Sequence, residues 1–108
     1  MLGQPSILHL LKDACEIIHP AAVDQWGEPA GATTTEIVPC RFEFEARMVL
    51  DSSGQEVVAA GEAFLDHVVT VEPTARIRYP VGGKEYTILR REFHKRGDLP
   101  THWEVWVK

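Results

Sequence analysis

Apolar and polar side chains alternate along much of this 108-residue chain. The longest alternating stretch runs from Pro39 to Leu50, with Phe42, Phe44, Met48 and Leu50 at every second or fourth position. A period of two places successive side chains on opposite faces of an extended segment, so one face is expected to meet a core. The stretch is therefore predicted to be one long strand.

Shorter stretches with the same period predict further strands at Asp13–His19, Glu56–Asp66 and His102–Lys108, and a short strand or strand-like connector at Val68–Glu72. The segment from Arg76 to Phe93 reads as a hairpin, because Gly82 and Gly83 can supply the positive φ angles of a tight two-residue turn. Six or so strands with turns at regular spacing predict an all-β fold, most simply a small antiparallel β-barrel. We expect its core to contain Phe42, Phe44, Met48, Phe64, Ile77, Tyr86, Ile88 and Val105.

Two segments do not follow the strand pattern. Residues 1–12 are predicted to form an N-terminal arm or short helix, because Ser6 can cap a turn that carries Ile7, Leu8, Leu10 and Leu11. Residues 21–35 are rich in Gly, Pro, Ala and Thr and are expected to form a long loop around Trp26. The chain is thus predicted to be a single domain, residues 1–108, with the barrel in residues 13–108.

Composition narrows the functional classes. Hydrophobic residues at 44% and charged residues at 25% are ordinary for a globular protein, and the net charge of −5 makes tight binding to nucleic-acid phosphates a poor expectation. The N-terminus lacks the pattern of a signal peptide, and no apolar stretch approaches the length of a membrane span. We therefore expect a protein made in the cytoplasm without membrane association, with Cys15 and Cys40 as reduced thiols.

No residue pattern predicts catalysis, a cofactor or a metal site. The histidines lie on separate predicted elements and lack metal-ligand spacing; they are His9, His19, His67, His94 and His102. Glu43 and Glu45 share a strand face, which is more typical of a solvated surface than of an acid–base pair. Neither a nucleophile elbow nor a phosphate-binding loop is present. The sequence predicts a protein that is not an enzyme.

The order of these elements resembles that of the head-closure proteins of tailed bacteriophages, also called head–tail joining or stopper proteins. The resemblance covers residues 13–108. It rests on a strand ending in Ile18-His19-Pro20, the loop Asp24-Gln-Trp-Gly-Glu-Pro29, the long alternating strand, the hairpin with Glu56-Val-Val-Ala-Ala60 and Ala63-Phe-Leu65, and Gly83-Lys-Glu-Tyr-Thr-Ile88. Trp26 takes the place of the aromatic residue in the family's Asp-x-Tyr-Gly-x-Pro-like loop. Pro73-Thr-Ala75 departs from the Gly-Asp pair that is common in the family.

This resemblance implies a structural virion protein that forms a ring, expected to be a dodecamer, in the phage neck. The ring would dock beneath the portal and adaptor proteins after packaging, retain the DNA until genome ejection and present a surface to the tail. Genomic DNA would pass through its channel without sequence-specific binding. By the same resemblance, Asp51, Ser52, Ser53, Gly54 and Gln55 are candidates for a small, flexible turn that gates the channel.

Contacts between subunits, or with other neck proteins, are expected from the N-terminal arm and the 21–35 loop. The candidate residues are Leu8, Leu11 and Trp26, apolar side chains that are hard to place in a small core. Two alternatives stay open: another ring-forming neck or tail protein, such as a tail terminator, and a monomeric β-barrel binding module. The 51–55 segment also fits an ordinary exposed hairpin turn.

Overall fold

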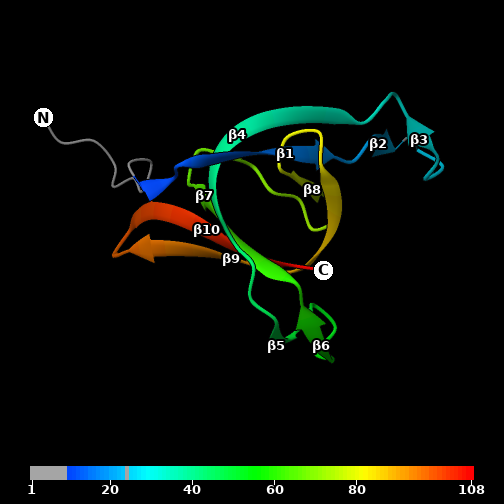
Figure 1. The fold of residues 1–108 in the computed structure, drawn as a ribbon. Coiled ribbons are helices and arrows are strands. Elements are labelled where there is room, and N and C mark those ends of the chain that lie inside the picture. Colours follow the sequence, from blue (N-terminus) through cyan, green and yellow to red (C-terminus); the bar gives the residue numbers. More distant parts are fainter. Residues whose placement is uncertain (1–9, 24) are drawn as a thin grey trace, which may run out of the picture.

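The protein is an all-β domain in which six strands close an antiparallel barrel. The computed structural model describes residues 10–23 and 25–108. Its strands are β1 (Asp13–His19), β2 (Ala22–Val23), β3 (Pro29–Ala30), β4 (Thr34–Glu43), β5 (Arg47–Leu50), β6 (Glu56–Ala59), β7 (Gly61–Asp66), β8 (Arg76–Tyr79), β9 (Lys84–Arg96) and β10 (Leu99–Val107). The order around the barrel is β1-β4-β7-β10-β9-β8, and β8 pairs with β1 to close it. The predicted all-β class and the small antiparallel barrel of about six strands are confirmed (Figure 1).

The barrel interior is filled by the apolar side chains that occupy alternate positions of each strand. Ile17, Ile77 and Val105 are fully buried, and the rest of the core comes mainly from Cys15, Val38, Cys40, Ala63, Leu65 and Val107. Closure pairs every barrel strand on both sides, which removes the exposed sheet edges that promote aggregation. One face of each strand is therefore in the core, and the other carries most of the charge.

Two short hairpins extend beyond the barrel in different directions (Figure 1). The β2–β3 hairpin continues from the ends of β1 and β4, and the β5–β6 hairpin continues from the ends of β4 and β7. Both are two-stranded sheets that are not part of the barrel. The segment from residue 21 to 35, predicted to be one loop, thus contains β2, β3 and the start of β4.

The prediction of one continuous strand from Pro39 to Leu50 is wrong. The structure interrupts it at residues 44–46, and it interrupts the returning arm at Ala60, whose amide donates to the carbonyl of Val107 at 2.7 Å. Between the pairs Glu43–Glu62 and Arg47–Ala59, one arm has three residues and the other has two. Regular pairing cannot span unequal arms, so the hairpin bends out of the barrel there.

The bend changes the predicted core. Phe42, Ile77, Tyr86 and Val105 are buried as predicted, and Phe64 and Ile88 are partly buried. Phe44 and Met48 were predicted in the core, but they are 64% and 57% exposed. Their period of two did not distinguish them from Phe42, because the chain leaves the barrel after Glu43.

The turn between β8 and β9 is longer than predicted. Tyr79 pairs with Lys84, so four residues, 80–83, connect the strands instead of two. Gly82 has a positive φ of 76°, whereas Gly83 does not. A Cβ at Gly83 would lie 2.6 Å from the Pro80 ring, which is why the second glycine is needed. The hairpin itself is confirmed, and the sequence misjudged only its turn.

The remaining expectations concern the ends and connectors. The stretch from Val68 to Glu72 contains no strand; it is the start of the connection between β7 and β8. The predicted N-terminal helix falls mainly on residues 1–9, which lie outside the described part of the chain. Leu11 and Lys12, directly before β1, have no regular secondary structure. In residues 10–23 and 25–108, no helix has the length and apolar character needed to cross a membrane.

Candidate functional site

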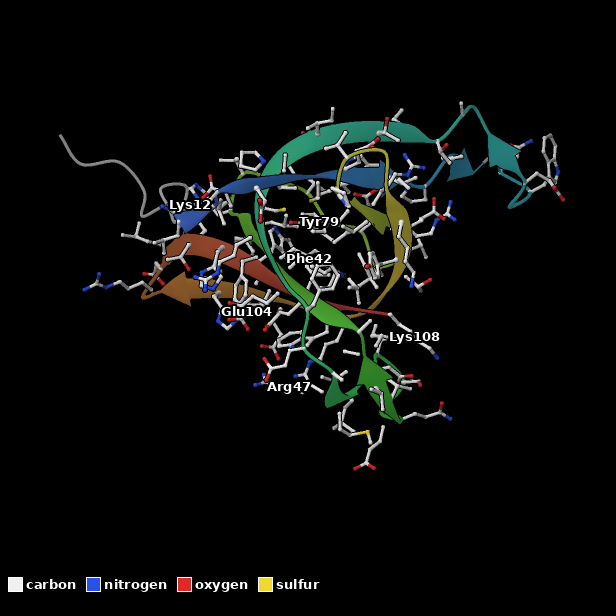
Figure 2. The ribbon with its side chains drawn as sticks, in the orientation of Figure 1. Lys12, Phe42, Arg47, Tyr79, Glu104 and Lys108 are labelled. Carbon is white, nitrogen blue, oxygen red and sulfur yellow. The ribbon has the colours of Figure 1, made fainter. Side chains whose placement is uncertain are left out.

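Aromatic side chains gather where the β5–β6 hairpin leaves the barrel. The ring of Phe42 stacks on Tyr79 with centroids 4.5 Å apart and planes 6° from parallel, and it meets Tyr86 at 5.3 Å. Phe44 contacts the same group from outside, with centroids 4.8 Å from Phe42 and 5.8 Å from Tyr79. Figure 2 shows Phe42 and Tyr79 inside the circle of barrel strands. The bend is thus anchored in the core by Phe42 and presents Phe44 to solvent.

The β5–β6 hairpin carries an exposed apolar face. Met48 and Val58 are directly opposite each other in the register, so their side chains lie on the same face, and Leu50 lies on that face two residues further along β5. Their exposed fractions are 57%, 55% and 47%. Met48, Leu50 and Val58 form what we call the hairpin apolar face. Contiguous apolar surface on a projecting element is typical of an interaction site.

The tip of this hairpin is ordered by Asp51. Its Oδ1 accepts hydrogen bonds from the Ser53 hydroxyl at 2.7 Å and from the amides of Ser53 and Gln55 at 2.9 Å. These bonds, that of the Ser53 hydroxyl first, lower the pKa of Asp51 below its ordinary value. Gly54, with φ of 85°, provides the left-handed residue of the turn. The five channel-loop candidates, Asp51–Gln55, therefore form one hydrogen-bonded turn.

The tip lies against β9 and close to two arginines. The amide of Ser52 donates to the carbonyl of Leu89 at 3.2 Å. Asp51 and Ser52 line an open hollow of about 520 Å³ together with Arg90, Arg91 and other residues of β9 and β10. Residues 51–55 contain no lysine or arginine, and both arginines reach the tip only through tertiary contact, which the sequence pattern could not predict.

Each arginine lies over a tryptophan ring, and Arg90 also pairs with an acidic residue. The Arg91 guanidinium lies over the Trp103 ring at 5.5 Å, and that of Arg90 lies over the Trp106 ring at 5.9 Å and pairs with Glu92. Such cation–π contacts stabilise an arginine at the surface while leaving part of it accessible. The tip therefore combines one carboxylate with two positioned positive charges.

The three assembly-contact candidates have different surroundings. Trp26 is 76% exposed in the turn between β2 and β3, as expected for a contact residue. Leu11 is only 8% exposed, so little of its side chain is accessible for a contact, although it does not belong to the core cluster inside the barrel. It lines a small hollow of about 200 Å³ with Leu10, Arg41, Phe64 and His102. Leu8 lies outside the described residues.

Carboxylates concentrate on the outer face near the base of the β5–β6 hairpin. Glu62 on β7 is partly buried, and burial is the largest influence that raises its pKa. Glu104, Glu43 and Glu45 add to this upward shift, which Arg47 opposes. In Figure 2, Arg47 lies below the barrel at the start of the projecting hairpin. This end of the molecule has a partly neutralised negative patch beside the hairpin apolar face.

At the end of β1, His19 joins three parts of the chain. Its Nδ1 lies 2.8 Å from Glu72, and its Nε2 lies 3.0 Å from Glu36. Partial burial lowers the pKa of His19, but the hydrogen bonds to Glu72 and Glu36 outweigh it and raise the pKa above its usual value. Cys15, on the same strand, is fully buried, and a hydrogen bond with Cys40, together with burial, raises the pKa of its thiol.

One further group was missed entirely by the sequence reasoning. His94, His102 and Glu104 come together on the outer face of β9 and β10, with ligand-type atoms within 4.8 Å of one another. The only sequence signal is the pair of patterns Glu92-x-His94 and His102-x-Glu104, each of which puts two side chains on one strand face. No family model and no curated protein matches this chain. Its own residues and surfaces must therefore carry the functional proposal.

Proposed function

We propose that this chain is a structural protein of the neck of a tailed bacteriophage. Copies of it form a ring, expected to be a dodecamer, that closes the head after DNA packaging and joins it to the tail. The ring docks beneath the portal and adaptor proteins and presents its other side to tail proteins. The proposal combines the resemblance in the order of elements with the surfaces described above, and it places the mature protein in the virion.

One observation supports ring assembly above the others: two projections that bear exposed apolar side chains leave the barrel at different places. Trp26 is on the β2–β3 side, and the hairpin apolar face is on the β5–β6 side. A contact that joins two different patches of identical subunits is heterologous, and repeated heterologous contacts generate a closed ring when the rotation closes. A closed barrel with no free edge favours association through such projections over strand addition.

The Asp51–Gln55 turn is proposed to face the channel. Its ordering by Asp51 and its contact with β9 favour motion of the whole hairpin as a unit, in place of a flexible tip. Arg90 and Arg91 lie beside the turn and are engaged by tryptophans, so they offer only weak, non-specific attraction to DNA. With a net charge of −5 on each chain, DNA is expected to pass without tight binding.

Incorporation into particles tests the assembly contact. In the virus that encodes the chain, Leu50→Asp should keep the subunit folded but exclude it from particles, because a charge would be buried in the contact. Leu99→Asp is the matched control, since Leu99 is 46% exposed and Leu50 is 47% exposed. Copy number per particle is measured by quantitative mass spectrometry. A wild-type chain that is absent from purified particles would refute the neck assignment and favour a monomeric binding module.

The phenotype of particles that lack the protein separates head closure from tail termination. Loss of a head-closure ring should yield heads that lose packaged DNA, together with complete free tails. Loss of a terminator should instead yield DNA-filled, closed heads and tails of abnormal length. Electron microscopy of lysates distinguishes the two results, and the second result would replace the head-closure proposal.

A further inference from the structure

We propose that His94, His102 and Glu104 bind a zinc ion on the outer face of the β9–β10 hairpin. The proposal is independent of the neck assignment, because it rests only on side chains within one subunit. Imidazole nitrogens and a carboxylate are common zinc ligands, and two histidines with one glutamate leave a fourth position for water or another carboxylate. Their ligand-type atoms all lie within 4.8 Å of one another.

The backbone register creates this cluster. His102 is directly opposite His94, and Glu104 is directly opposite Glu92, so all four side chains lie on the same face of the two strands. The register shifts between Pro100 and His102, which leaves Thr101 as an extra residue on β10. Without that shift His102 would be opposite Phe93, on the other face from His94. Bulges of this kind often re-aim a side chain at a functional position.

Thr101 also determines which nitrogen of His102 is free. Its hydroxyl donates to the carbonyl of His94 at 3.0 Å, so its oxygen is left to accept a hydrogen bond from His102 Nδ1, 2.9 Å away. A neutral His102 then carries its proton on Nδ1 and a lone pair on Nε2. That nitrogen lies 3.7 Å from Glu104 Oε1. A second hydrogen-bonded group that fixes the ring in this way is characteristic of histidines that bind metals.

His94 presents its own Nε2 to the same place. This nitrogen lies 3.2 Å from Glu104 Oε2 and 3.6 Å from Glu92 Oε2. The contacts lack the direction of hydrogen bonds, and the atom is inaccessible to solvent without a hydrogen-bond partner. A buried polar atom with no partner is costly and calls for an explanation. A cation between His94 and Glu104 would satisfy it.

The spacing suits a tetrahedral ion. Ligands about 2.0–2.1 Å from zinc are about 3.3 Å apart in tetrahedral geometry. His94 Nε2 lies 3.2 Å from Glu104 Oε2, and His102 Nε2 lies 3.7 Å from Glu104 Oε1, so each histidine is close to this separation from one oxygen of the carboxylate. The imidazole rings are stacked nearly parallel, with centroids 4.7 Å apart, so both rings must turn for their Nε2 lone pairs to meet at one ion. Glu92 pairs with Arg90, so it can be the fourth ligand only if it leaves Arg90 to bind the ion. Otherwise a water molecule completes the site.

Zinc binding by the full chain tests the proposal. After treatment with a chelator, titration with zinc chloride is followed by calorimetry. We expect one zinc ion per chain, with affinity reduced at least about tenfold by His94→Gln, His102→Gln or Glu104→Gln. His19→Gln is the matched control, because His19 also lies between two carboxylates but has no second histidine partner. This control should bind zinc as the wild type does.

Two further readouts fix the position of the ion and the state of the variants. Histidine ¹⁵N spectra of the wild type should show zinc-dependent shifts of Nε2 in His94 and His102, with Nδ1 of His102 still protonated. Circular dichroism should show that all four variants are folded, as expected for partly exposed side chains. Two outcomes would overturn the proposal. One is that the three site variants bind zinc as tightly as the wild type does. The other is that the wild type binds no zinc.

Discussion

Phe42 and Phe44 are two residues apart, yet truncating them to alanine should have very different effects on stability. Phe42 is 8% exposed and stacks on Tyr79, with Tyr86 on a second side. Phe44 is 64% exposed and contacts this group from outside. The sequence treats the two residues alike, since both occupy the same face of the predicted strand. Comparing them therefore tests the bend after Glu43.

The expected magnitudes follow from burial. Phe42→Ala removes a buried ring and leaves a cavity among Tyr79 and Tyr86, which should reduce the free energy of unfolding by about 3–5 kcal/mol. Phe44→Ala loses only partial aromatic contacts, worth about 1 kcal/mol. Because a domain of this size changes its melting temperature by about 4–8 °C per kcal/mol, the two variants should be clearly resolved.

Urea denaturation, followed by tryptophan fluorescence and circular dichroism, measures both free energies. The slope with denaturant should be unchanged in both variants, which would show that the extent of unfolding is the same. Equal destabilisation by the two substitutions would mean that Phe44 is packed in the core and that the strand continues through residues 44–46. Such a result would refute the bend after Glu43, and with it the projecting position of the hairpin apolar face that supports ring assembly.

Three further predictions concern the bend and the titrating groups. Gly61→Ala should destabilise the barrel by about 1–3 kcal/mol in the same urea assay, because a Cβ there would lie 2.8 Å from the Glu43 carbonyl and from the Phe42 ring; an unchanged midpoint would contradict the close approach. Glu62→Gln should become more stable relative to the wild type as pH rises. Because the pKa of Glu62 is raised in the folded protein, protonated Glu62 stabilises the fold fully below about pH 4.5, and this stabilisation is lost as pH rises through the raised pKa. Melting temperatures that run parallel for both proteins from acid to neutral pH would exclude this effect. His19→Gln should destabilise the protein most below about pH 6.5, because protonated His19, whose pKa is raised in the folded protein, stabilises the fold there. This stabilisation is lost as pH rises through the raised pKa, so the difference between variant and wild type should shrink at mildly alkaline pH. A difference that does not depend on pH would count against the contacts with Glu36 and Glu72.

Local pattern was sufficient for much of the fold. The bounds of β1 agree with the predicted Asp13–His19, and β10 contains nearly all of His102–Lys108. Both strands have an apolar period of two and a well-defined boundary. Pro20 ends β1, and a hairpin turn precedes β10. Among the site candidates, exposure of Trp26 followed from its place in a turn-rich loop, while burial of Leu11 did not, because that depends on what the segment packs against.

The sequence by itself determined which residues share a strand face, and hence an all-β barrel with its core of alternating apolar positions. Only the tertiary structure decided which faces meet the core and which residues lie opposite one another. A period of two is the same for a buried barrel strand and for a projecting hairpin, so Phe44 and Met48 could not be distinguished from Phe42. Likewise, one extra residue at Thr101 reverses the face of His102 and brings it beside His94. Such a bulge is fixed by pairing across the whole sheet, because backbone hydrogen bonds on both sides of a strand must be satisfied together.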